Sequence, residues 1–340
     1  MIVARASLRL VPLRLVPPHL VPLILALLLS ALTAPLPAFS QQYPAKPIRI
    51  VVPSPAGSAA DTVTRAVATK LTERLGQQVI SDPRPGASGI VAAEIVLKAA
   101  PDGYTLLAAS SASHGINVSL YPKLPYDAVR DCVPVSLLVQ MPLVLMLHPT
   151  VPAKNLKEFI ALAKARPGQL NFASSGSGTT THLAGELLKY MARIDFLHVP
   201  YKGSQQALVD TLSGQMAMNI APILTALPQV KSGRLRALAV TTAQRSTTAP
   251  EIPTVAEAAL PGYEATLWYG LCAPAGTSTE IVKRLNTEVV AILALTEVRE
   301  SLKQLGADAA GSGSEAFGTY IKSEIAKWAT VVKLSGAQPN

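Results

Sequence analysis

The stretch "LNFASSGSGTTTHLAGEL", residues 170–187, decides the fold. It begins as a short apolar strand, passes through a loop of Gly, Ser and Thr, and continues with the spacing of an amphipathic helix. The stretch "IVVPSPAGSAADTVTRAV", residues 50–67, has the same order of strand, small-residue loop and helix. Two such units predict an α/β protein in which matching loops sit at the carboxyl ends of two strands.

Outward from these stretches, short β-rich runs alternate with amphipathic helices. The alternation predicts parallel sheets covered by helices on both faces. A second unit begins near "PLVLMLHP", and the extended run "YEATLWYGLCAPAG" predicts a return crossing to the first. A helix is expected to follow, opened by a capping box of Thr277 and Glu280. We therefore expect two lobes with a cleft, in which lobe 1 comprises residues 41–143 and 264–340 and lobe 2 comprises 144–263.

Residues 1–40 have the features of a secretory signal peptide. Arg5, Arg9 and Arg14 precede an apolar run, no acidic residue is present, and Ala38-Phe39-Ser40 has the small-x-small pattern of a cleavage site. We expect cleavage near Ser40 and export of the mature chain. An uncleaved membrane anchor is the alternative, which the prolines within the apolar run disfavour.

Charge and cysteine content limit the function classes. The chain has 30 basic and 21 acidic residues, and removal of the three leader arginines leaves 27 − 21 = +6. The basic residues are scattered, so we expect no nucleic-acid partner. Cys132 and Cys272 lie in apolar contexts, and nothing in their spacing places them together. Two buried thiols are therefore favoured over a disulfide.

The spacing within residues 174–182 excludes several chemistries. A hydrolase elbow requires Gly-x-Ser-x-Gly, and the first glycine is missing before Ser177. A P-loop requires a lysine, and a dinucleotide fingerprint a third glycine; both are absent from the loop. The histidines of the mature chain have no metal-binding spacing, so we expect no metal and no cofactor. His182 is expected to hold the loop by a hydrogen bond. A serine hydrolase using Ser177 and His182 stays open as the alternative, because a triad is free in chain order.

Both small-residue loops are suited to an anion. Each offers free backbone N–H groups at a helix N-terminus and residues small enough for close approach. Ser58 and Asp61 also form a capping-box pattern, so Asp61 has two open roles, tied to its own helix or in contact with a ligand. A site that holds a carboxylate with uncharged donors and does not change it fits both loops.

The sequence also resembles a known family over nearly the whole mature chain. The motifs "KPIRIVVPSPAGSAAD", "RPGASG", "PDGYTLL", "LYPKLPYD", "SSGSGTTTHLAGEL", "HVPYKG", "LRALAVTT", "IPTVAEA" and "LPGYEATLWYGLCAPAGT" occur in the order of the Bug family. These are periplasmic receptors of tripartite tricarboxylate transport systems. The resemblance implies a type II periplasmic-binding-protein fold, in which two Rossmann-like lobes joined by crossing hinge strands enclose a small carboxylate, partly through waters. Its implied partners are integral-membrane transporter subunits or a sensor ectodomain, with the receptor itself a monomer and not an enzyme.

The resemblance also implies the ligand-binding residues. Carried over position by position, they are Ser54, Pro55, Ala56, Gly57, Ser58, Asp61, Ser111, His114, Asn117, Ser174, Ser175, Gly176, Gly178, Thr179, His182, Tyr201 and Ala221.

Two departures from the family pattern bear on the ligand. Ser54 and Ser58 replace an aromatic residue and a glycine of the family's first loop, which enlarges that wall and adds hydroxyls. Members that bind amino acids tend to have an acidic residue where this chain has Ala221, with only Asn219 nearby. A buried ammonium without a carboxylate partner would be costly. We therefore expect an acid without an amine: a dicarboxylic, hydroxycarboxylic or aromatic carboxylic acid.

Overall fold

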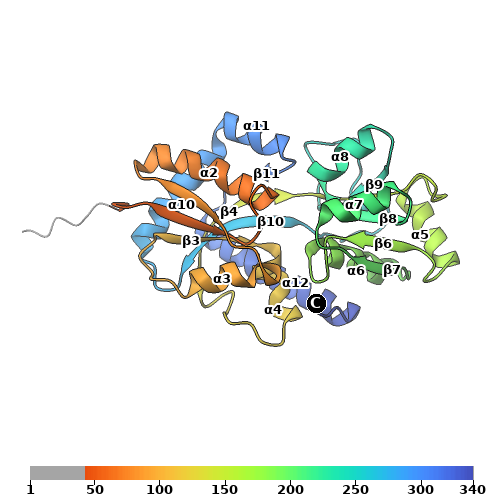
Figure 1. The fold of residues 1–340 in the computed structure, drawn as a ribbon, viewed down its shortest axis with the longest axis horizontal. Coiled ribbons are helices and arrows are strands. Elements are labelled where there is room, and N and C mark those ends of the chain that lie inside the picture. The colour runs from red at the N-terminus through yellow and green to blue at the C-terminus, as the bar shows by residue number, and fades with distance from the viewer. Residues whose placement is uncertain (1–42, 340) are drawn as a thin grey trace, which may run out of the picture. The chain divides into compact units, whose positions relative to one another are not determined.

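Two mixed β-sheets organise residues 43–339, the part of the chain that the computed structural model describes (Figure 1). The predicted leader, residues 1–40, lies outside the described residues. We call the part built on the six-stranded sheet lobe 1 and the part built on the five-stranded sheet lobe 2. Within residues 43–339, no helix is sufficiently long and apolar for a membrane crossing.

The sheet of lobe 1 has a parallel half and an antiparallel half. Strand β1 pairs in parallel with β2 and β3, while β10 runs antiparallel to both β3 and β4. In spatial order the strands are β11 (Asp308–Ala309), β4 (Cys132–Met141), β10 (Leu267–Pro274), β3 (Thr105–Ser110), β1 (Ile48–Val52) and β2 (Val79–Pro83). The antiparallel strands are the crossing segments expected between the lobes.

Helices cover both faces of this sheet because side chains alternate along each strand. On β1, Ile48 and Ile50 pack with α2, α10 and α11, whereas Val51 packs with α3 and α12 on the other face. The helical segments of lobe 1 are α2 (Ala59–Leu75), η2 (Ala87–Gly89), α3 (Ile90–Leu97), η3 (Ala112–Ile116), α4 (Asn117–Leu120), α10 (Thr279–Ala294), α11 (Thr296–Gln304) and α12 (Ser314–Ser335).

Lobe 2 repeats the same plan. Strand β6 pairs in parallel with β7 and β8, and β5 runs antiparallel to β8 and β9. In spatial order the strands are β7 (Leu197–Pro200), β6 (Asn171–Ser174), β8 (Met218–Pro222), β5 (Leu143–Leu147) and β9 (Arg236–Val240). The helices are α5 (Leu156–Ala165), α6 (Thr180–Ala192), α7 (Ser204–Leu212), α8 (Ile223–Lys231) and α9 (Val255–Ala258).

The connections between the lobes place the functional loops. Strand β4 continues across the hinge into β5. The segment before β10 returns beside the end of β9, where Thr241 Oγ1 donates to Ala265 O at 2.6 Å. Strand β10 enters lobe 1 from the hinge, and β1 and β3 run opposite to it, so their carboxyl ends lie toward the hinge. Strand β5 enters lobe 2 from the hinge, and β6 and β8 run opposite to it, so their carboxyl ends lie toward the hinge as well. The sequence-based lobe boundaries, after residues 143 and 263, stay a prediction.

The last helix packs against both lobes (Figure 1). Trp328, Val331 and Val332 of α12 lie in one apolar cluster with Ile116 and Leu120 of lobe 1 and with α5 and α6 of lobe 2. We call these five residues the apolar seam. A buried carboxylate, Glu324, accepts hydrogen bonds from the indole nitrogens of Trp268 at 2.9 Å and Trp328 at 3.1 Å. The seam therefore joins the lobes beside the crossing strands.

Two sequence-based expectations are wrong. Cys132 and Cys272 form a disulfide, with a Cα–Cα distance of 5.8 Å, in place of two thiols. The antiparallel pairing of β4 with β10 sets Cys132 opposite Pro274 and Cys272 opposite Pro134, so the two side chains meet. The N-cap of α10 is Ser278, not Thr277, whose hydroxyl donates to Pro274 O.

Candidate functional site

Two loops with the same local geometry lie at the starts of α2 and α6. We call residues 53–58 the lobe-1 loop and residues 174–179 the lobe-2 loop. Ser58 caps α2 by accepting from Asp61 N at 3.3 Å, and Thr179 caps α6 by accepting from His182 N at 3.4 Å. Both loops reach their cap through a glycine with positive φ, which a side chain would strain.

Several backbone N–H groups at the two helix starts have no acceptor among residues 43–339. Among the described residues, none accepts a hydrogen bond from the N–H of Ala59 or Ala60 in α2, or from that of Ser177, Thr180 or Thr181 at α6. Unpaired N–H groups at a helix start, together with the helix dipole, favour a negatively charged group. The two loops therefore have the donors that a carboxylate requires.

The hydroxyls of the lobe-2 loop and of Thr181 bond to one another and to the backbone of the loop. Ser175 N donates to Thr181 Oγ1 at 3.0 Å, and Thr179 Oγ1 donates to Gly176 O at 2.7 Å. Ser174 Oγ accepts from Gly176 N at 3.1 Å. These bonds fix the loop before any ligand arrives, which lowers the entropy cost of binding.

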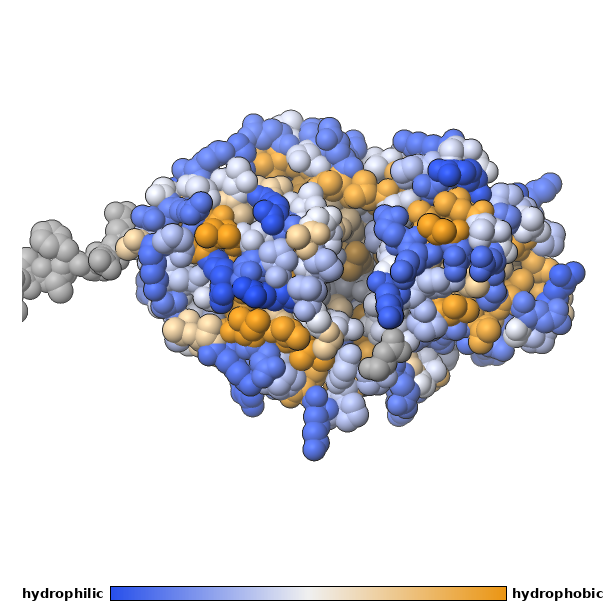
Figure 2. All heavy atoms as spheres, viewed as in Figure 1, coloured by the Kyte–Doolittle hydropathy of each residue, from blue (hydrophilic) through white to orange (hydrophobic). Residues whose placement is uncertain are grey.

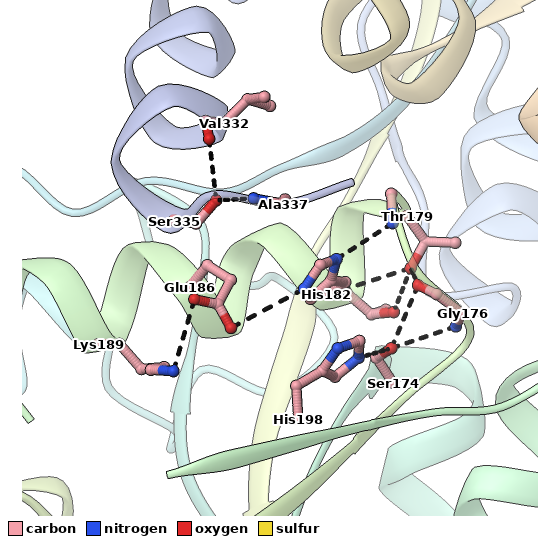
Figure 3. Close-up of polar contacts among 12 residues, drawn as sticks. Ser174, Gly176, Thr179, His182, Glu186, Lys189, His198, Val332, Ser335 and Ala337 are labelled. Carbon is pink, nitrogen blue, oxygen red and sulfur yellow. Dashed lines mark hydrogen bonds and ion pairs between the residues drawn. The ribbon is translucent and has the colours of Figure 1, made fainter. Parts of the chain in front are cut away.

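Two stacked imidazoles lie beneath the lobe-2 loop (Figure 3). The ring centroids of His182 and His198 are 3.8 Å apart, and the planes differ by 10°. His182 Nδ1 accepts from Gly178 N at 3.1 Å, and His198 Nε2 is 2.7 Å from Ser174 Oγ. Burial lowers the pKa of His182 to about 4; burial and the neighbouring His182 and Lys189 lower that of His198 to about 3. Both rings are neutral at pH 7.

The two lobes meet beside the lobe-2 loop. Ser111 Oγ of lobe 1 and Thr180 Oγ1 of lobe 2 are 2.8 Å apart and buried, and a Cβ added to Gly178 would collide with Leu120. Figure 2 shows a hollow between the lobes on the face that it draws. A separate crevice of about 610 Å³ lies at the hinge, between loop 242–247 and helix α11. It contains no residue of either loop, so we do not assign it to the ligand.

Some predicted site residues are buried and make their contacts within the protein. Asp61 is 1 % exposed, and its carboxylate accepts from Gly57 N at 2.8 Å and from Ser81 Oγ at 2.7 Å. This contact pattern supports its structural role. Asn117 donates to Ser88 O, and the side chain of Ala221 lies in the apolar core of lobe 2.

His114 and Tyr201 have distinct surroundings. His114 is fully buried, and its ring lies within 4.8 Å of the sulfurs of the disulfide, which as a disulfide does not supply thiolate ligands. Burial lowers the pKa of His114 to about 4. Tyr201 is half-buried and donates its hydroxyl to Asp210 Oδ2 at 2.7 Å.

The remaining predicted residues belong to the two loops. Pro55, Ala56 and Gly57 are exposed, and Ser54 is half-buried, so the tip of the lobe-1 loop is open to solvent. The sequence reasoning missed His198, Glu186 and Leu120 as parts of this region. His198 reaches the lobe-2 loop because β7 pairs in parallel with β6, in a register that sets His198 opposite Phe172. The residues of neither strand, taken alone, indicate this register.

The geometry expected of a hydrolase from Ser177 and His182 is not present. His182 Nδ1 accepts a backbone N–H, and Nε2 faces Glu186 Oε1 at 3.8 Å, so neither nitrogen is bonded to Ser177. Two other serines contact a histidine, Ser174 with His198 and Ser113 with His114, and both serines are fully buried. A nucleophile must reach its substrate, so neither pair supplies one.

The fold defines a class. The chain has the type II periplasmic-binding-protein fold, with two Rossmann-like lobes, crossing hinge strands and small-residue loops at the carboxyl ends of strands in both lobes. Its residues 63–336 match the model of the tripartite tricarboxylate transporter family receptor. The chain therefore belongs to that family.

Curated relatives agree with this assignment. A protein encoded in the tcbD-tcbE intergenic region of a Pseudomonas species is 40% identical over 85% of this chain and 86% of its own length. BugT of Bordetella pertussis is 38% identical over 89% of this chain and 93% of its own.

Solved structures agree as well. An R. palustris protein with adipate has a TM-score of 0.79 at 36% identity, covering 88% of this chain and 100% of that chain. MatC from Rhodopseudomonas palustris with bound malate has a TM-score of 0.75 at 34% identity, covering 85% and 100%. The periplasmic binding protein BugD has a TM-score of 0.75 at 31% identity, covering 87% and 99%.

Proposed function

We propose that this chain is an exported receptor that captures a small carboxylic acid without an amine between its lobes and delivers it, unaltered, to membrane subunits of a tripartite tricarboxylate-type transporter. The observation that carries the proposal is the pair of matching helix starts, in α2 and α6, with unpaired N–H groups. The structures with adipate and malate, both amine-free dicarboxylates, support the ligand class. A sensor ectodomain is the alternative partner.

The site residues also limit the class of ligand, because none of them offers a free carboxylate to an ammonium group. The one carboxylate among the predicted site residues is Asp61, and it already bonds to Gly57, Ser81 and Arg65. At the position where amino-acid-binding relatives are expected to have an acid, Ala221 is buried in an apolar cluster. An ammonium group would therefore lose its hydration without gaining a charged partner, which is costly.

A ligand panel tests the proposal. The mature protein is titrated by calorimetry with adipate, malate, an aromatic carboxylate, aspartate and glutamate, and its thermal unfolding is followed with each acid. An acid present at 100 times its Kd stabilises the folded state by about 2.7 kcal/mol and raises the melting temperature. We expect one equivalent of an amine-free acid to bind and to be recovered intact after denaturation. Tighter binding of aspartate or glutamate contradicts the ligand class, and turnover of the acid contradicts a receptor.

A further inference from the structure

The starts of α2 and α6 share one hydrogen-bond pattern but differ in its acceptor. In each, the side chain three residues after the cap accepts the N–H of the glycine before the cap. Asp61 Oδ2 accepts from Gly57 N at 2.8 Å, and His182 Nδ1 accepts from Gly178 N at 3.1 Å. The same backbone turn is therefore held by a carboxylate in lobe 1 and by an imidazole in lobe 2.

The acceptor in lobe 1 is charged. Burial alone would raise the pKa of Asp61, but hydrogen bonds from Ser81, Arg65 and Gly57 outweigh it and hold that pKa below its usual range. The carboxylate therefore occupies the positive end of α2 and interacts favourably with the helix dipole. Arg65 Nε, 2.9 Å from Asp61 Oδ2, offsets part of this charge, and the start of α2 therefore favours a second anion less than the start of α6 does.

The acceptor in lobe 2 is uncharged, and α6 has no acidic residue in its first turn. The acidic residue of α6, Glu186, is one turn further along and lies 3.7 Å from Lys189 Nζ, which is also 3.3 Å from Asp195. Its contact with His182 is through Nε2, whereas Gly178 N donates to Nδ1 of the same ring.

The stack with His198 supports the neutral state. Two cationic rings at a centroid distance of 3.8 Å would repel each other. His198 also fixes the other end of the lobe-2 loop through Ser174, whose hydroxyl accepts Gly176 N. Both ends of the loop are thus held by neutral imidazoles.

From this difference we infer that His182 is a positioning residue: its neutral ring supports the lobe-2 loop while leaving the start of α6 free of negative charge, so lobe 2 takes the charge of the bound carboxylate. This inference rests on the proposed function. His182 acts through Gly178 and need not touch the ligand.

Substitutions that separate hydrogen bonding from charge test the inference. His182→Asn keeps a neutral acceptor near the position of Nδ1, whereas His182→Asp keeps the acceptor and adds a negative charge. With adipate or malate as the titrant at pH 7.5, we expect His182→Asn to bind within about threefold of the wild type and His182→Asp at least tenfold more weakly. Gln169→Glu is the matched control, because it adds one negative charge at an exposed position before β6, at the opposite end of that strand from the lobe-2 loop.

A second variant covers the case in which His182→Asp does not fold, as judged by thermal unfolding without acid. Asp61→Asn removes the negative charge from lobe 1 and keeps an acceptor for Gly57, so we expect unchanged or tighter binding. Equal affinities of His182→Asn and His182→Asp, or at least tenfold weaker binding by Asp61→Asn, would overturn the inference alone. Failure of the wild type to bind any acid of the panel would overturn the proposed function, and the inference with it.

Discussion

Gly57 and Gly178 occupy the same place in the two lobes but have different neighbours. Their φ angles are +76° and +73°, so any side chain is strained in both. A Cβ on Gly57 would have no heavy atom within 4 Å, whereas one on Gly178 would collide with Leu120 of the other lobe. The pair therefore separates backbone strain from contact between the lobes.

This comparison gives a prediction. Gly57→Ala should lower the free energy of unfolding by the left-handed strain alone, about 1–2 kcal/mol, and Gly178→Ala should lower it by about 1–3 kcal/mol more because a packed side chain must shift. Urea unfolding without ligand measures both. Equal losses in the two variants would contradict a contribution from the contact with Leu120.

The buried histidines predict how stability depends on pH. The pKa values of His114, His182 and His198 fall to about 4, 4 and 3, because burial disfavours the charged form. Below pH 6.5 the unfolded chain therefore binds protons on these histidines, whereas the folded chain does not. The free energy of unfolding is highest above pH 6.5 and decreases as the pH falls toward 4. Each such histidine contributes a slope of about 1.4 kcal/mol per pH unit. Urea unfolding at pH 7.5, 6 and 5 checks this, and a flat profile would contradict it.

At the scale of elements, the order of strands and helices could be predicted from the sequence, and their lateral pairing could not. The hydrophobic periodicity of β1, α2, β6 and α6 can be seen within each segment, and so can the capping pattern that begins at Ser58. The contact between His182 and His198 depends on the register of β6 with β7, and the disulfide depends on that of β4 with β10. Both registers are set by contacts among distant residues, which a single sequence does not display.

The disulfide yields a prediction at this scale. It closes a loop of 140 residues between the two strands that cross from lobe to lobe. Replacing both cysteines by Ala should lower the free energy of unfolding by about 2–4 kcal/mol, mainly by releasing the unfolded chain. Urea unfolding of the oxidised wild type, the reduced wild type and the double variant measures this. A reduced wild type as stable as the oxidised one would contradict the prediction.

In the whole molecule, the apolar seam and the pair Ser111–Thr180 already join the lobes on one side. A rotation of one lobe against the other must keep or break these contacts, which lie beside the lobe-2 loop. This asymmetry was not foreseeable from the sequence, in which α12 reads as an ordinary amphipathic helix of lobe 1.

The disulfide and helix α12, which packs against both lobes, together make the protein suited to conversion into an optical sensor. The two cysteines of the chain are bonded to each other, so Leu334→Cys, at a position 47% exposed near the end of α12, would introduce a single reactive thiol. A fluorophore attached there would lie close to the apolar seam and outside both loops. Its emission would report domain rotation without occupying the cleft.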